Sequence, residues 1–282
     1  MLDALRSRLP ESWRRLVPAK MPWSPITIPV VRLTGVIAAR EGAINLDRFA
    51  PLLDRGFAQA KQGQKLLLLA IESPGGSPVQ SDLIGAYIRR KAAETDVRVL
   101  AVIGDVGASG GYWIACAADQ IFANRMSIVG SIGVIGGGFG AVDLIRRIGV
   151  ERRVVTAGAN KLRNDPFSPE RADDVAFNRD LLDDIHTQFK DWVRERRGAA
   201  IENHEDAVFD GSYMLGSKAL RLGLIDALGD VRSIIHAEAG KDAKPAFIGP
   251  RRKFSLARLV GGAGSAMLNT IEAEAWHGRA PK

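Results

Sequence analysis

The sequence predicts an α/β protein built around a mostly parallel β-sheet. Segments typical of strands and of helices alternate along most of the 282 residues, and no internal repeat interrupts them. Residues 65–72 and 97–103 are near-continuous apolar runs, typical of strands buried on both faces. A hydrophobic content of 46% is enough for a sizeable core. We therefore expect helices to cover the sheet.

The elements follow from local patterns. Asn45 is expected to cap the helix that follows it, Pro78 suits a first helical turn, and Ser168-Pro169-Glu170 forms a capping signal before a long helix. The strands are expected over residues 30–38, 65–72, 97–103, 120–123 and 151–156. The helices are expected over residues 46–61, 78–93, 109–118, 140–148, 168–197, 213–222 and 231–239.

The two ends differ from this pattern. Residues 1–28 are basic and proline-rich and read as an N-terminal arm, with apolar residues at the spacing of a short amphipathic helix. That helix either docks on its own domain or a partner subunit, or lies at the surface of a membrane. Residues 241–282 read as a C-terminal tail, with a weak helix over 254–275. The central domain is thus expected over residues 29–240.

Composition narrows the classes of function. The net charge is +7, but no basic stripe interleaved with aromatic residues is present, so we expect no nucleic-acid partner. No apolar stretch reaches the roughly 20 residues of a membrane span, and no signal peptide is evident. We therefore expect a cytoplasmic protein. The alternative is a protein that contacts the inner face of the membrane through its N-terminal arm. The single cysteine, Cys116, is expected in the core. We find no metal-ligand cluster and expect no cofactor.

The segment Gly107-Ala108-Ser109-Gly110-Gly111-Tyr112 indicates chemistry at a turn between a strand and a helix. A serine needs a base before it can attack a carbonyl, and none of the four histidines lies near Ser109 in the sequence. The candidate base is Lys161, which must be neutral and therefore desolvated to act. Each residue also has an ordinary interpretation, because serine is a common helix cap and lysine is usually solvated.

A second glycine-rich loop, Ser73-Pro74-Gly75-Gly76, follows the strand over 65–72. Glycine allows a close backbone approach, and a helix start leaves N–H groups unpaired, so such a loop can stabilise an oxyanion. A tight turn is the ordinary interpretation. Two such loops at successive strand ends favour a site, because ligands bind at the carboxyl ends of strands in open parallel sheets. The N–H of Gly110 is the second candidate donor.

Four motifs together resemble the bacterial signal peptide peptidase A (protease IV) family, over roughly residues 28–240. They are Ser73-Pro74-Gly75-Gly76, the run from Ala108 to Asp119, Gly130-Ser131-Ile132-Gly133-Val134, and Lys161. The resemblance implies a Clp/crotonase-like fold and a serine–lysine peptidase that forms an acyl-enzyme. It implies that Ser109 is the nucleophile and Lys161 the general base, that Gly76 and Gly110 supply the oxyanion N–H groups, and that Ser131 orients the lysine.

The resemblance further implies peptide substrates, namely signal-peptide remnants or other unfolded or membrane-associated polypeptides. It also implies a homo-oligomer in which serine and lysine meet across a subunit boundary. Many relatives carry an N-terminal membrane-spanning helix, and we expect none in this sequence. Two other functions stay open: a crotonase-like enzyme acting on an acyl-CoA thioester, and a non-catalytic scaffold that binds peptides. His186 is expected on the long helix, without a role.

Overall fold

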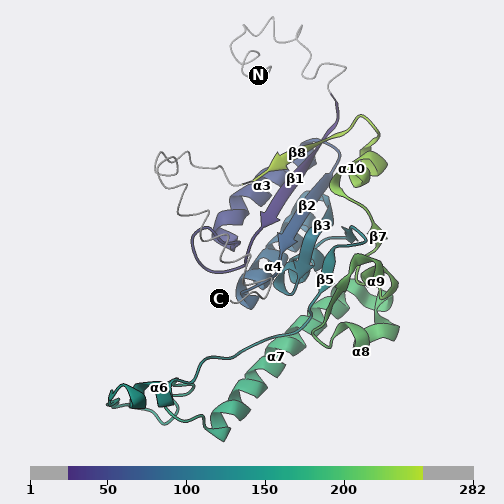
Figure 1. The fold of residues 1–282 in the computed structure, drawn as a ribbon. Helices are drawn as coiled ribbons and strands as arrows, with labels where there is room; N and C mark the ends of the chain where they lie inside the picture. Colours follow the sequence, from purple (N-terminus) through teal and green to yellow (C-terminus); the bar gives the residue numbers. More distant parts are fainter. Residues whose placement is uncertain (1–24, 250–282) are drawn as a thin grey trace, which may run out of the picture. The chain divides into compact units, whose positions relative to one another are not determined.

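The computed structural model describes residues 25–249, whose strands form one eight-stranded, mostly parallel sheet (Figure 1). The strand order is β6-β5-β3-β2-β1-β8, with β4 beside β3 and β7 beside β4, and only β5 and β6 pair antiparallel. The strands are β1 (Thr27–Thr34), β2 (Leu66–Ser73), β3 (Arg98–Ala108), β4 (Gln120–Ala123), β5 (Ile128–Gly130), β6 (Tyr213–Leu215), β7 (Ala227–Leu228) and β8 (Lys244–Ile248). The mostly parallel α/β architecture expected from the sequence is confirmed.

The helices alternate with the strands, as expected. Asn45 caps α3, because its side chain accepts a hydrogen bond from the N–H of Arg48 at 3.0 Å, and Pro78 lies in the first turn of α4. The α-helices are α3 (Leu46–Gln62), α4 (Pro78–Thr95), α5 (Gly110–Cys116), α6 (Val142–Arg147), α7 (Ala172–Arg197), α8 (Glu205–Val208), α9 (Gly216–Arg221) and α10 (Val231–Ala239). Among the described residues, no helix is both long and apolar enough to cross a membrane.

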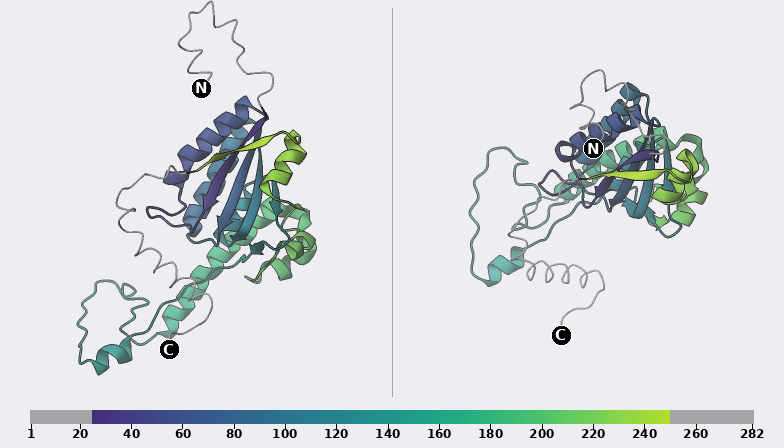
Figure 2. Two further views of the ribbon diagram at one scale, coloured as in Figure 1. Left: turned by 45° about the horizontal axis from the view of Figure 1, so that its top comes forward. Right: turned by 90° about the horizontal axis from the view of Figure 1, so that it is seen from above.

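The sheet carries a hydrophobic core on each face. The larger cluster joins the strands to residues of α3, α4, α5 and α7, and the smaller joins the opposite face to α10. The left view of Figure 2 places α3 and α10 on opposite sides of the sheet. The middle strands β2 and β3 are apolar on both faces for this reason, which explains their continuous apolar runs. Cys116 is buried in the larger cluster, and burial raises the pKa of its thiol to about 12.

Three expected elements differ. Residues 151–156 form no strand, because this segment is exposed and has no strand beside it to pair with. Helix α7 begins at Ala172 rather than at 168, since the Ser168 hydroxyl donates to the Asp165 carboxylate instead of capping the helix. Residues 213–215 form strand β6, which pairs with β5, before the helix resumes as α9.

Some short strands were not anticipated. The chain from 128 to 130 forms β5 and pairs with the end of β3, which lengthens the sheet beside Ser109. Lys244–Ile248, which were expected to lie in the C-terminal tail, form β8 and pair with β1. The expected helices of the N-terminal arm and of residues 254–275 lie outside the described residues.

A long excursion leaves the sheet between β5 and α7. The chain runs outward after Gly133, forms α6, and returns along α7 (Figure 1). We call residues 133–171 the projection. Helix α6 has no buried residue, and the side chains of Ile135, Phe139 and Val155 are 96%, 93% and 100% exposed. Apolar exposure of this extent is typical of interaction surfaces.

Candidate active site

Ser109 lies at the end of β3, where α5 begins. Its backbone has a φ of +51°, in a region that residues other than glycine rarely adopt. Its N–H donates to the Gly130 carbonyl at 2.8 Å, and its own carbonyl accepts from Trp113. The Ser109 side chain makes no capping hydrogen bond, so the ordinary interpretation as a helix cap does not hold. The half-buried hydroxyl is thus available to a substrate.

The Ser73–Gly76 loop packs directly against this turn. A Cβ atom added at Gly75 would lie 2.7 Å from the Gly110 nitrogen and 2.7 Å from the Ser109 Cβ, so only glycine fits there. Gly75 is held in turn by two hydrogen bonds, from its N–H to the Ser73 hydroxyl and from the Ile37 N–H to its carbonyl. The two glycine-rich loops expected at neighbouring strand ends therefore touch.

Gly76 and Gly110 present their N–H groups at this junction. Among the described residues, neither N–H donates to a backbone or side-chain acceptor. The loop around Gly76 is anchored by its neighbours instead, because the Ser77 N–H donates to the Ile37 carbonyl at 2.8 Å. Two unpaired N–H groups beside a free hydroxyl form an arrangement that can stabilise an oxyanion.

Ser131 lies next to Ser109 because β3 and β5 are parallel neighbours. Their register pairs Ala108 with Gly130, so the residues that follow leave the sheet side by side. Ser131 also has a positive φ, +53°, and its N–H donates to the Ser212 carbonyl at 2.8 Å. The structure thus brings together four of the five predicted site residues: Gly76, Ser109, Gly110 and Ser131.

Lys161 is the predicted site residue that does not join this cluster. It is exposed, in a turn of the projection, and within residues 25–249 no hydrogen bond joins it to Ser109 or Ser131. Figure 1 shows the segment between α6 and α7, which carries this turn, at the outer end of the excursion. Its role as a base stays a prediction, and within one chain the lysine lies apart from the serine.

The turn that carries Lys161 is fastened to the first turns of α7. The side-chain amides of Asn164 and Asn178 exchange two hydrogen bonds, of 3.0 and 2.6 Å. The Arg163 guanidinium lies 4.1 Å from the centre of the Phe177 ring and 3.9 Å from the Asp174 carboxylate. These contacts therefore attach the turn to helix α7.

The other half of α7 contacts the serine cluster. The Trp113 ring packs against Phe189, and the His186 Nε2 lies 3.0 Å from the Ile132 carbonyl, next to Ser131. Along the helix, Asn178 precedes His186 by about 12 Å at 1.5 Å per residue. No role is expected for His186 from the sequence, whereas in the structure its contact with Ile132 links α7 to the site.

Two further residues around the site were missed. The Ile37 backbone brackets the Gly75–Gly76 loop through hydrogen bonds on both sides, which no side-chain motif signals. Glu72, directly before the loop, accepts hydrogen bonds from the N–H groups of Asp105 and Val106 near the end of β3. The sequence signal that could have identified Glu72 is its position as a charged residue at the end of an apolar strand.

Comparisons with known proteins identify the family of this chain. The family model described as Peptidase family S49 matches residues 91–244, which include Ser109, Ser131 and Lys161. A relative from Brucella abortus, named Na(+)/H(+) antiporter NhaA, is 42% identical over 263 residues, which are 92% of this chain and 35% of the relative. The chain thus spans about a third of that relative, whose name describes the whole protein.

Two other relatives carry protease names. The "Putative protease slr0021" from Synechocystis sp. is 36% identical over 62% of this chain and 64% of its own length. The "Serine protease SPPA, chloroplastic" from Arabidopsis thaliana is 31% identical over 74% of this chain and 31% of its own length. The α/β sheet described above is the ClpP/crotonase-like fold of the matched family. With the family model covering more than half of its residues, the chain belongs to peptidase family S49, the family of signal peptide peptidase A and SohB.

Proposed function

We propose that this chain is a serine peptidase in which Ser109 attacks the substrate carbonyl and Lys161 of a second copy is the general base. The observation that carries the proposal is the Ser109 turn itself. Its strained backbone presents a hydroxyl that makes no capping hydrogen bond. Beside it are the N–H groups of Gly76 and Gly110, which have no acceptor among the described residues. Backbone strain of this kind persists where the surrounding structure enforces it and clusters at active sites.

The reaction follows from these groups. The neutral amine of Lys161 takes the proton of Ser109 as the hydroxyl oxygen bonds to the peptide carbonyl carbon. The N–H groups of Gly76 and Gly110 donate to the oxyanion. The peptide C–N bond then breaks, the leaving amine takes the proton from the lysine, and an acyl-enzyme remains. Water attacks this ester as Lys161 accepts its proton, and the ester C–O bond breaks, which returns a proton to Ser109.

Two features support assembly of the pair across subunits. Within one chain, Lys161 is exposed and lies apart from Ser109, whereas a base must lie within hydrogen-bond reach of the proton it takes. The projection that carries the lysine also exposes large apolar side chains, including Ile135, Phe139 and Val155. A second copy that covers them would desolvate the lysine as well, which favours its neutral form.

The substrates proposed are signal-peptide remnants and other unfolded or membrane-associated polypeptides. Gly76 is exposed, while Gly75 and Gly110 are buried, so a substrate carbonyl can reach the site from the side of Gly76. An extended peptide can present a carbonyl there, whereas a folded surface cannot readily do so. The protease names of the Synechocystis and Arabidopsis relatives support a peptide rather than an acyl-CoA substrate.

Covalent labelling tests the proposed nucleophile. A fluorophosphonate probe, which forms a stable bond with activated serine hydroxyls, is expected to label the full-length chain at Ser109 alone. Peptide mapping by mass spectrometry locates the label, and heat-denatured protein is the control. Labelling of a serine other than Ser109 would refute the assignment. So would a folded protein that the probe does not label and that hydrolyses no fluorogenic peptide.

A second test addresses the turn that holds the lysine. Asn178→Ala removes both amide hydrogen bonds to Asn164, so the lysine should be less well placed and kcat should fall about tenfold with KM unchanged. The matched control is Arg179→Ala, an exposed neighbour on the same helix without a hydrogen bond or ion pair among the described residues. Steady-state hydrolysis of a fluorogenic peptide measures both. Equal rates for the two variants would contradict a positioning role for the amide pair.

A further inference from the structure

Strand β3 carries a bulge three residues before Ser109. In the pairing of β2 with β3, Ile71 faces Ile103 and Ser73 faces Gly107. Glu72 alone therefore spans the gap that Gly104, Asp105 and Val106 occupy on β3. A bulge of this kind bends the strand and changes the direction in which it delivers the residues that follow.

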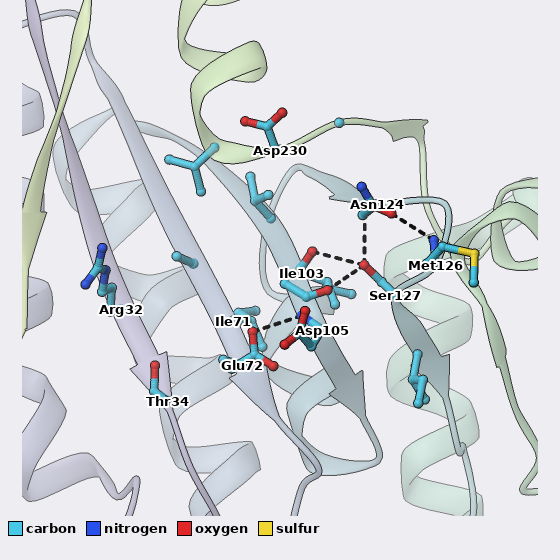
Figure 3. Close-up of a pocket in the computed structure, with 16 residues that line it drawn as sticks. Arg32, Thr34, Ile71, Glu72, Ile103, Asp105, Asn124, Met126, Ser127 and Asp230 are labelled. Carbon is cyan, nitrogen blue, oxygen red and sulfur yellow. Dashed lines mark hydrogen bonds between the residues drawn. The ribbon is translucent and has the colours of Figure 1, made fainter.

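The Glu72 carboxylate replaces the backbone partners that the bulge has lost. One carboxylate oxygen accepts a hydrogen bond from the Asp105 N–H at 2.9 Å, which Figure 3 shows. The other accepts one from the Val106 N–H at 3.0 Å. A Cβ atom at Gly104 would overlap the same carboxylate, so a side chain there would require the carboxylate to move. Hydrogen bonds from N–H groups to a charged acceptor are among the stronger ones in proteins.

The opposite side of the bulge is held by Ser127. Its hydroxyl lies within hydrogen-bond distance of the Ile103 and Gly104 carbonyls, and its oxygen accepts from the Asn124 N–H at 3.0 Å (Figure 3). Ser127 is only 2% exposed. Glu72 thus accepts hydrogen bonds from N–H groups of the bulge, and the Ser127 hydroxyl faces its carbonyls.

Packing alone does not hold this segment. A cavity of about 650 Å³ lies beside the bulge, and Glu72, Gly104 and Asp105 line it. Gly104 and Asp105 are exposed, so burial against neighbouring elements constrains them little. The hydrogen bonds that the Glu72 carboxylate accepts, together with those of Ser127, therefore hold the bulge in place.

We propose that Glu72 is a positioning residue for the nucleophile. Glu72 directly precedes the Ser73–Gly76 loop, and its carboxylate holds the segment of β3 that leads to Ser109. One side chain therefore links the loop that carries the Gly76 N–H to the strand that delivers the attacking hydroxyl. The inference rests on the proposed function, because it concerns the geometry between these two groups.

The test compares Glu72→Gln with Asp105→Asn in the full-length protein. Glutamine has the size of glutamate, but its NH₂ group faces one of the two backbone N–H groups and repels it. Asp105→Asn makes the same change of charge within the bulge, at an exposed carboxylate that accepts no hydrogen bond among the described residues. For Glu72→Gln we expect kcat to fall about 10- to 100-fold with KM unchanged, and for Asp105→Asn neither should change.

Hydrogen–deuterium exchange supplies a readout that does not depend on activity. Peptides covering residues 104–109 should exchange faster in Glu72→Gln than in wild type, whereas Asp105→Asn should match wild type. Unchanged exchange in Glu72→Gln, or an equal loss of kcat in both variants, would overturn the proposal. Faster exchange in Glu72→Gln, together with a wild-type protein that shows no peptidase activity, would retain the role of Glu72 in the bulge and reject the proposed function.

A further variant covers the case in which Glu72→Gln does not fold. Glu72→Asp keeps the charge but is one methylene shorter, so it cannot reach both N–H groups. We expect it to fold and to show intermediate exchange and an intermediate kcat. Wild-type values for both in a folded Glu72→Asp protein would also overturn the proposal, because they would mean that the reach of the carboxylate is unimportant.

Discussion

Co-expression of Ser109→Ala and Lys161→Ala chains is expected to restore peptidase activity that neither variant has alone. Each substitution by itself removes a reacting group and should lower kcat at least about 10⁴-fold. In a ring of mixed chains, each site takes its serine from one subunit and its lysine from the next. With equal amounts of both chains, about a quarter of the sites then carry both groups, and the activity should recover to about that fraction of wild type.

Two differently tagged chains purified in tandem make this measurement direct, because only mixed oligomers are retained. The matched control is tandem-purified Ser109→Ala with Ser109→Ala, which contains no nucleophile and should stay inactive. An inactive mixed oligomer beside an active wild type would mean that serine and lysine come from the same chain. That outcome would require the projection to fold back over the site, away from where the single chain places Lys161.

Gly76→Ala is expected to lower kcat about 10²- to 10³-fold, the cost of losing one oxyanion donor. The physical reason is local. Gly76 has a φ of +140°, which side-chain-bearing residues rarely adopt, and a Cβ atom there would overlap the Ile37 carbonyl oxygen. The loop must shift to relieve the overlap, which moves the Gly76 N–H away from the oxyanion and strains the hydrogen bond from Ser77 to Ile37.

Gly249→Ala, outside the projection, is the control for this variant. A Cβ atom at Gly249 meets nothing within 4 Å among the described residues, and its φ does not lie in the left-handed region. Thermal unfolding is recorded for both variants, so that a loss of activity in Gly76→Ala is read only from folded protein. Wild-type kcat in a folded Gly76→Ala chain would exclude its N–H as an oxyanion donor.

Much of the fold could be predicted from local sequence. The helices over residues 46–62, 78–95 and 231–239 and strand β4 agree with their patterns, because capping residues and apolar spacing act within a few neighbouring residues. Strands β5 to β8 could not be predicted, because their local sequence does not mark them and each is defined by its pairing with a distant strand. Residues 151–156 illustrate the reverse, since a strand-like pattern forms no strand without a partner.

The site divides in the same way. The sequence by itself predicted which groups could react: Ser109, Lys161 and the glycines at 76 and 110 follow from residue type, from glycine-rich loops after apolar strands, and from the family resemblance. Only the tertiary structure decided which of them meet. Parallel pairing of β3 with β5 brings Ser131 beside Ser109, and the bulge held by Glu72 sets the approach of the nucleophile. The separation of Lys161 from Ser109 depends on the length and packing of α7, a property of distant contacts that no local pattern contains.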